Sequence, residues 1–140
     1  RDNIASDFPE VRTEISALLK VEAELQEIVQ LVGSDALPID QQLTLEVARM
    51  IREYFLQQNG FDPIDAYSGV AQQYAMARAI LTFQAEAKKA MSAGAVLQDV
   101  VNVPARTELM RARFAEGYLE KIDGLVEAMV GEIAGAVENN

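Results

Sequence analysis

The sequence has no cysteine, no histidine and no tryptophan among its 140 residues. Without cysteine the chain cannot form a disulfide, a thiolate nucleophile, an iron–sulfur cluster or a cysteine-ligated zinc site. Without histidine it cannot form the Ser-His-Asp triad, the HExxH zinc helix or the Glu-x-x-His di-iron bundle. Carboxylates, lysines, tyrosines and hydroxyls are therefore the side chains left for catalysis.

Basic residues are also scarce. Lysine and arginine total 12 against 22 aspartates and glutamates, which gives a net charge of −10. Such a balance disfavours binding to nucleic acid and to anionic lipid. No apolar run approaches the roughly 20 residues that span a bilayer, and the N-terminus does not combine a basic start with an apolar signal core. We therefore expect no nucleic-acid partner and no direct membrane insertion.

The length suits one domain with its own core, and no internal repeat, low-complexity tract or long linker divides the chain. We predict a single helical domain over residues 1–140. The chain begins at Arg1 rather than a methionine and ends in Glu138, Asn139 and Asn140. These ends suggest a piece excised from a longer polypeptide or a processed product, and we favour the excised piece.

Apolar periodicity predicts an all-α fold, a helical bundle of about four long helices plus one or two short ones. The first helix is expected to begin after Asp7 and Pro9 and to end at Gly33. Its apolar residues follow a 4-then-3 rhythm that only Glu22 interrupts: Val11, Ile15, Leu18, Leu25, Val29 and Val32. This rhythm fits a coiled-coil seam or a long helix within a bundle, and the charged seam position favours the bundle.

The other helices follow the same period, and no segment shows the alternation of a strand. They are predicted from about Pro38 or Asp40 to Gln58, from Asp65 to Ser92, from Val96 to Asn102, from Pro104 to about Phe114, and from Tyr118 onward. The face of the second is expected to comprise Leu43, Val47, Met50, Ile51 and Tyr54. Gly94 marks the end of the third.

Motifs that carry chemistry are sparse. No GxxxxGK[ST] phosphate loop is present. An acidic cluster of Glu22, Glu24 and Glu27 could attract a cation, but a solvated helix face is the favoured interpretation. The basic residues that could touch phosphate or an acidic partner are more simply surface charge: Lys88, Lys89, Arg106, Arg111 and Arg113. We predict no catalytic residue and no metal ligand in this chain.

Two stretches carry a family resemblance, LEVARMIREYFLQQNGFD and QQYAMARAILTFQAEAKKAM. From about Val11 to Ala134 the chain resembles the C-terminal helical domain of the catalytic A subunit, or alpha chain, of archaeal A-type and V-type rotary ATPases. In that family the phosphate loop and the catalytic acid lie upstream, in a nucleotide-binding domain that this chain lacks. The resemblance therefore implies that the isolated chain is inactive.

The resemblance also implies cofactors, partners and location. The parent enzyme hydrolyses or makes ATP at interfaces with B subunits, and couples this to rotation of central-stalk subunits and to movement of protons or sodium ions. Magnesium-bound ATP or ADP would be held mostly by the missing upstream domain, and none would be retained by this chain alone. The location implied is cytoplasmic, peripheral on the cytoplasmic face of the cell membrane through the complex.

One implied site lies in the turn after the second helix. In related subunits a phenylalanine that matches Phe61 lines the adenine pocket, and a glutamine that matches Gln57 lies nearby. An aromatic face can stack on a purine, and an amide can both donate and accept hydrogen bonds. The alternative is that Phe61 packs the turn onto the third helix.

A second implied site is the loop GSDALPID, which takes the place of the acidic DELSEED loop that presses on the rotating shaft in the F-type relative. The resemblance assigns a rotor contact to Ser34, Asp35, Ala36, Leu37, Pro38, Ile39 and Asp40. Only two of these are charged, and proline stiffens the loop, so we expect a steric contact through an apolar tip at Leu37 and Pro38. The alternative is an ordinary interhelical loop.

A second class of function stays open from the residues themselves. A helical module without an active site could be a free-standing adaptor or scaffold that binds a protein partner through an exposed apolar groove. A phosphate loop several hundred residues upstream in the reading frame would favour the ATPase, and an immediate start codon would favour the adaptor.

Overall fold

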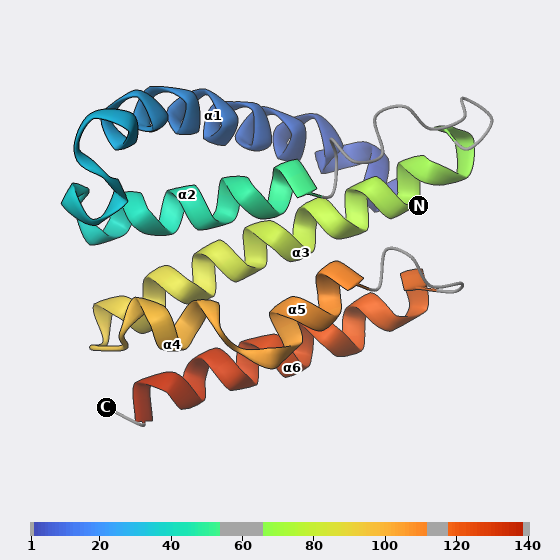
Figure 1. Ribbon diagram of the computed structural model, residues 1–140. Coiled ribbons are helices and arrows are strands. Elements are labelled where there is room, and N and C mark those ends of the chain that lie inside the picture. The colour runs from blue at the N-terminus through green and yellow to red at the C-terminus, as the bar shows by residue number, and fades with distance from the viewer. Residues whose placement is uncertain (1, 54–65, 112–117, 139–140) are drawn as a thin grey trace. The chain divides into compact units, whose positions relative to one another are not determined.

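The computed structural model describes residues 2–53, 66–111 and 118–138, and within these ranges every regular element is a helix (Figure 1). The long helices are α1 (Asp2–Val32), α2 (Ile39–Ile51), α3 (Ala66–Ser92) and α6 (Tyr118–Glu138), and the short ones are α4 (Leu97–Val101) and α5 (Pro104–Arg111). A 3₁₀ turn, η1 (Ser34–Ala36), precedes α2. The predicted all-α fold of about four long and two short helices is confirmed.

Contacts divide the chain into two compact units, residues 1–78 and residues 79–140. Helix α3 crosses the division and contributes its first half to one unit and its second half to the other. The single-domain boundary of 1–140 stays a prediction.

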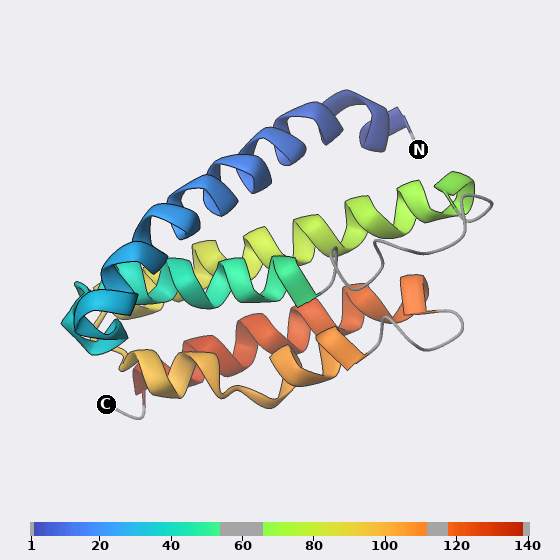
Figure 2. The same ribbon diagram turned by 45° about the horizontal axis from the view of Figure 1, so that its top comes forward.

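The first unit contains an antiparallel hairpin of α1 and α2, whose helices contact each other and meet at the turn that holds η1 (Figures 1 and 2). Its core takes Val11 and Leu25 from α1, and the buried face of α2 comprises Leu43, Val47, Ala48, Met50 and Ile51. This confirms the predicted face of the second helix except for Tyr54, which lies outside the described residues. The hairpin thus presents its turn at one end of two packed helices.

Helix α1 begins earlier than the sequence suggested. It starts at Asp2 and contains Pro9, so the prediction of a start after Asp7 and Pro9 is wrong. A proline inside a helix removes one backbone donor and crowds the carbonyl four residues earlier, which favours a kink, but the turns on both sides can remain helical. A proline can mark a first turn, but here it lies within a helix of 31 residues.

Two glycines end their helices as predicted. Gly33, with φ 89°, donates its N–H to the Val29 carbonyl at 2.8 Å and closes α1. Gly94, with φ 111°, donates to the Met91 carbonyl at 3.1 Å, while the N–H of Ala95 reaches the Ala90 carbonyl at 3.0 Å. The two hydrogen bonds from Gly94 and Ala95 form a Schellman motif, which depends on a residue that tolerates positive φ.

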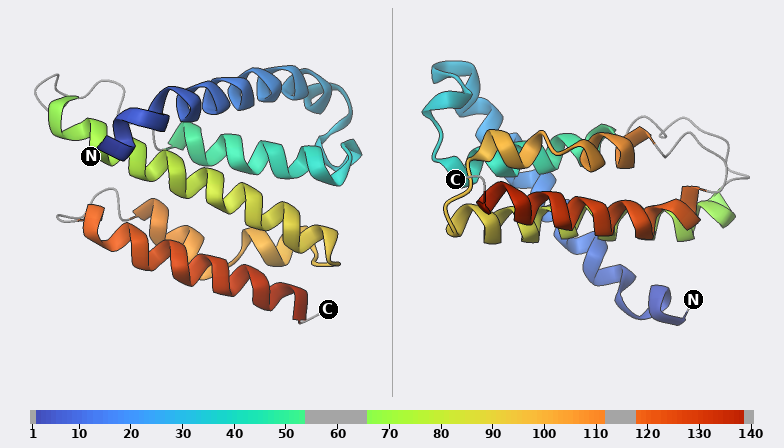
Figure 3. Two further views of the ribbon diagram at one scale, coloured as in Figure 1. Left: turned by 180° about the vertical axis from the view of Figure 1, so that it is seen from behind. Right: turned by 90° about the horizontal axis from the view of Figure 1, so that it is seen from below.

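In the second unit, α4 and α5 follow each other along α6 and both contact it (Figure 3). The core of this unit includes Ile80, Phe83, Val100, Leu109, Met129 and Ile133, all essentially inaccessible to solvent. The start of α5 is held by α6, because a carboxylate oxygen of Glu132 accepts the N–H of Ala105 at 2.8 Å. Pro104 takes the first helical position of α5, where a missing N–H has little consequence.

Candidate functional site

The loop predicted to contact a rotor is an ordered turn at the end of the α1–α2 hairpin. The N–H of Leu37 donates to the Ser34 carbonyl at 3.1 Å and closes η1. The side-chain amide of Gln42 donates to the Leu37 carbonyl at 3.0 Å, and the N–H groups of Gln41 and Gln42 converge on the Pro38 carbonyl at 2.9 and 3.0 Å. The turn is therefore fastened to the first turn of α2.

Leu37 is not at the surface of this loop. It is only 5% exposed, whereas its neighbours Ala36 and Pro38 are exposed. The expectation of an apolar tip formed by Leu37 and Pro38 is therefore wrong for Leu37. Packing of the loop against the hairpin turns that side chain inward, and burial of a leucine side chain contributes about 1.5–3 kcal/mol.

Other apolar side chains surround the loop instead. Leu31 and Val32, in the last turn of α1, are 84% and 61% exposed, and Ile39, in the first turn of α2, is 52% exposed. Isolated exposed apolar residues are common, but these three gather at the two helix ends that the same turn joins. The end of the hairpin therefore offers apolar contacts from residues on both sides of the predicted loop.

The charged residues of the loop are also on the surface. Asp35 lies in η1, Asp40 lies in the first turn of α2, and both are exposed. The backbone carbonyl of Asp40 accepts a hydrogen bond from the hydroxyl of Thr44 at 3.2 Å, within the first turn of α2. This end of the hairpin thus exposes both carboxylates and apolar side chains. Substitutions that remove one kind and keep the other would distinguish their contributions.

The adenine-pocket residues proposed from the resemblance, Gln57 and Phe61, lie outside the described residues. Along the sequence, α2 ends at Ile51 and the described residues continue to Glu53, four positions before Gln57. The assignment of these two residues stays a prediction.

The acidic cluster of the first helix is split by the fold. Glu24 and Glu27 are exposed, as expected for a solvated face, but Glu22 is buried. Its Oε1 accepts hydrogen bonds from Nε and Nη2 of Arg52 at 2.9 and 2.6 Å. The solvated interpretation is therefore wrong for Glu22, because a carboxylate within an apolar seam must find a partner when the helices pack.

Sequence reasoning missed Arg52, although a signal for it exists. A glutamate in the seam position of an otherwise apolar helix calls for a basic partner on the facing helix. That partner lies 30 residues along the chain. Only the pairing of α1 with α2 identifies which of the basic residues it is.

The basic residues of the second unit also include both exposed side chains and one with structural contacts. Lys88, Lys89 and Arg111 are exposed, which agrees with surface charge, and Arg113 lies outside the described residues. Arg106 instead places its guanidinium 5.3 Å from the centre of the Phe83 ring and donates to the Val101 carbonyl at 3.0 Å. Its cation–π and hydrogen-bond contacts give it a structural role at the start of α5.

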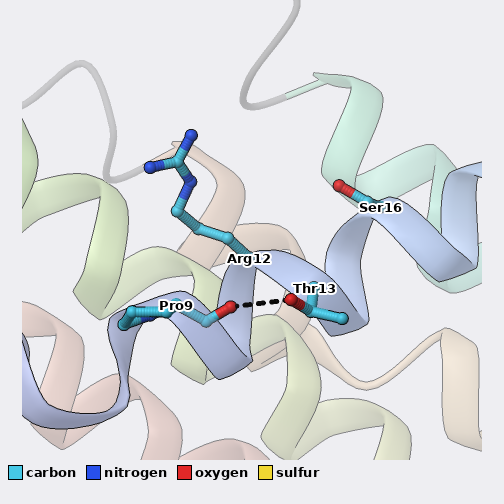
Figure 4. Close-up of a pocket in the computed structure, with 4 residues that line it drawn as sticks. All are labelled: Pro9, Arg12, Thr13 and Ser16. Carbon is cyan, nitrogen blue, oxygen red and sulfur yellow. Dashed lines mark hydrogen bonds between the residues drawn. The ribbon is translucent and has the colours of Figure 1, made fainter.

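A pocket of about 430 Å³ lies beside α1 and is lined by Pro9, Arg12, Thr13 and Ser16 (Figure 4). The Thr13 hydroxyl donates to the Pro9 carbonyl at 2.9 Å, while the Arg12 side chain extends away from that bond. All four residues are exposed. This surface hollow has no buried polar group among its described lining residues, and we assign it no function.

Within the described ranges no group of three or more acidic residues is arranged to hold a metal ion. Across the same ranges, none of the helices combines the length and apolar character needed to cross a membrane.

Comparison with known proteins identifies relatives of this chain. Residues 1–101 match the family model described as the C-terminal domain of V and A type ATP synthase. The chain is 44% identical over 133 residues to the A subunit of the A-type ATP synthase of Methanosarcina barkeri, and 50% identical over 125 residues to its counterpart in Natronomonas pharaonis. It is 45% identical over 115 residues to V-type ATP synthase alpha chain 1 of Clostridium tetani.

The matches cover most of this chain but a small part of each relative. They span 95%, 89% and 82% of the chain, respectively. The corresponding shares of the relatives are 23%, 21% and 19%. The chain therefore corresponds to less than a quarter of the length of these relatives.

Proposed function

The chain belongs to the family of C-terminal domains of V and A type ATP synthases, and from this membership we propose that it is the C-terminal domain of the A subunit of such a rotary complex. The observation that carries this proposal is the 44% identity over 133 residues to the A subunit of an A-type ATP synthase. In this role the chain transmits force and does no bond-breaking chemistry. Family membership favours this role over a free-standing adaptor.

The proposed activity is that of the whole complex. Its A subunit hydrolyses or makes ATP at interfaces with B subunits and couples the reaction to rotation of the central stalk and to transport of protons or sodium ions. Magnesium-bound nucleotide is held mostly by an upstream domain, and this chain alone retains none. The complex places the chain in the cytoplasm, peripheral on the cytoplasmic face of the cell membrane.

The rotor contact is assigned to the hairpin end, residues 34–40, together with the exposed apolar side chains that flank it. The support is geometric: the turn is fastened to α2 by the Gln42 amide, and Leu31, Val32 and Ile39 stand exposed around it. Exposed charge pairs are screened by salt and contribute only about 0–1 kcal/mol each, less than the burial of apolar side chains can supply. A predominantly steric and apolar contact follows.

The adenine contact is assigned to Gln57 and Phe61, close after the described end of α2. The support is the resemblance carried by the stretch LEVARMIREYFLQQNGFD. Stacking on an aromatic ring is worth roughly 1–3 kcal/mol per base in single-strand binders, enough to influence nucleotide affinity without any part in the chemistry.

The rotor contact can be tested by deleting Ser34, Asp35 and Ala36 from the full-length protein and assembling the complex. ATP hydrolysis should persist because the catalytic groups lie elsewhere, while torque on a loaded shaft should fall. The matched control is D35N/D40N, which removes both charges but leaves the shape of the loop. Equal torque from the deletion variant and the parent would remove this loop from the mechanism, and a loss confined to D35N/D40N would favour an electrostatic push.

A further inference from the structure

The ion pair between Glu22 and Arg52 joins the two helices of the hairpin through a fully engaged carboxylate. One oxygen of Glu22 accepts two hydrogen bonds from the Arg52 guanidinium, and the other accepts the Gln26 side-chain amide at 3.3 Å. The Glu22 side chain is 10% exposed and that of Arg52 is 43% exposed. Glu22 is thus held from its own helix and from the facing one.

Stability alone does not account for a charge at this position. Burial of a carboxylate is costly, and replacement of a buried ion pair by apolar residues of similar size is often neutral or stabilising. A polar residue in an apolar seam has a better attested effect, which is to fix the register of two helices. The seam of α1 has the heptad rhythm in which such a device is needed.

The neighbours of Glu22 along the seam explain why only one register satisfies Arg52. The next seam positions on either side, about one helical turn away, are Leu18 and Leu25. If α1 slid by one turn along α2, apolar packing would be largely preserved, but Arg52 would lose its carboxylate partner and face a leucine at the seam position. Apolar contacts are non-directional and distinguish such registers weakly.

The ion pair is placed far from the turn that it would control. Val32 lies ten positions after Glu22, which corresponds to about 15 Å of helix. Arg52, the C-cap of α2, lies thirteen positions after Ile39, about 20 Å along the helix. A slip of one helical turn, about 5.4 Å, would force the short connection between the helices to refold.

We propose that Glu22 and Arg52 form a register lock, which fixes α1 against α2 and thereby sets how the hairpin end is presented to its partner. The fixed register follows from the ion pair and the seam. Its consequence for force transmission rests on the proposed rotor contact. Glu22 and Arg52 are positioning residues in this account and touch neither nucleotide nor rotor.

The test replaces the ion pair by apolar residues in the full-length protein, as E22L/R52M. Spin labels at the exposed positions Lys20 and Arg49, in a protein freed of cysteines elsewhere, report the register as a distance distribution. The parent should give one narrow population. E22L/R52M should melt at a similar temperature yet gain a second population, in which α1 is shifted by one turn, about 5.4 Å along the axis. The distance between the labels should change by less than that shift, because the labels lie on facing helices. The exchanged pair E22R/R52E should restore the single population.

Two further variants keep the result decisive. E86Q/K89Q removes an ion pair 3.8 Å apart within α3, between an exposed lysine and a half-buried glutamate, and should leave the distances unchanged. If E22L/R52M does not fold, E22Q keeps the shape and removes the charge, and its distances decide the question. A single parent-like population in the folded variant that lacks the ion pair overturns the register lock.

Torque of the assembled complex separates the lock from the proposed function. A displaced population with reduced torque supports both. A displaced population with undiminished torque retains the lock and contradicts the rotor contact at the hairpin end. If E22L/R52M keeps parent-like distances while the loop-deletion variant loses torque, the lock is contradicted and the rotor contact is retained.

Discussion

Two leucines that flank the same turn should respond in opposite ways to the same substitution. Leu37 is 5% exposed and Leu31 is 84% exposed, six residues earlier. Leu37→Ala removes buried methyl groups and should destabilise the chain by about 2–3 kcal/mol, the lower part of the usual range, because a loop can partly collapse onto the space. Leu31→Ala removes solvated atoms and should change stability by less than about 0.5 kcal/mol.

Urea unfolding of the 140-residue chain, followed by circular dichroism, measures this difference. With a slope of roughly 1–3 kcal/mol per molar urea, Leu37→Ala should lower the midpoint by about 0.7–3 M, and Leu31→Ala should leave it nearly in place. In the assembled complex the order should reverse, since Leu31→Ala removes an exposed apolar contact at the hairpin end and should reduce torque without loss of stability.

The reasoning fails if Leu31→Ala shifts the urea midpoint as far as Leu37→Ala does, because exposure would then not govern either effect. It also fails in its functional part if Leu31→Ala leaves torque unchanged while the complex assembles normally.

Three further predictions concern the rest of the chain. The purified 140-residue chain should not hydrolyse ATP, since it has no phosphate loop, and sustained phosphate release after rigorous purification would contradict this. In the intact protein, Phe61→Ala should raise KM for ATP roughly tenfold, the equivalent of about 1.4 kcal/mol of stacking, with a smaller change in kcat; unchanged KM with a lower melting temperature would identify a packing role. Gly94→Ala should destabilise by about 1–2 kcal/mol because alanine resists φ 111°, whereas Gly131→Ala, in helix α6 with open space around its Cβ position, should stabilise by about 0.5–1 kcal/mol; thermal melts that show the same sign for both would refute the argument.

Local chemistry explains which features could be predicted. The ends at Gly33 and Gly94 and the buried face of α2 follow from residues a few positions apart. Helix periodicity and glycine caps act over that range, so one sequence suffices to predict them. Pro9 misleads because a proline can mark a first turn or lie within a helix, and the residue itself does not distinguish the two.

Tertiary packing decides the features that sequence reasoning misses. Leu37 is turned inward by the packing of the loop on the hairpin, which no local pattern encodes. The partner of Glu22 is 30 residues away, and Arg106 stacks on Phe83 from another helix. In each case the sequence marks a residue that needs a partner, such as a charge in an apolar seam, but the fold selects the partner.

The central claim is that the end of the α1–α2 hairpin touches the rotating stalk. The most direct measurement introduces a single cysteine at the exposed position Asp35 in the full-length protein, freed of its other cysteines, and pairs it with cysteines along the central-stalk subunits. The account predicts a disulfide to the central stalk that stops rotation and ATP turnover, both restored by a reductant, and none from Lys88, an exposed control position in the other unit. If Asp35→Cys forms no bond with the stalk while Lys88→Cys does, the rotor contact lies elsewhere and the account is wrong.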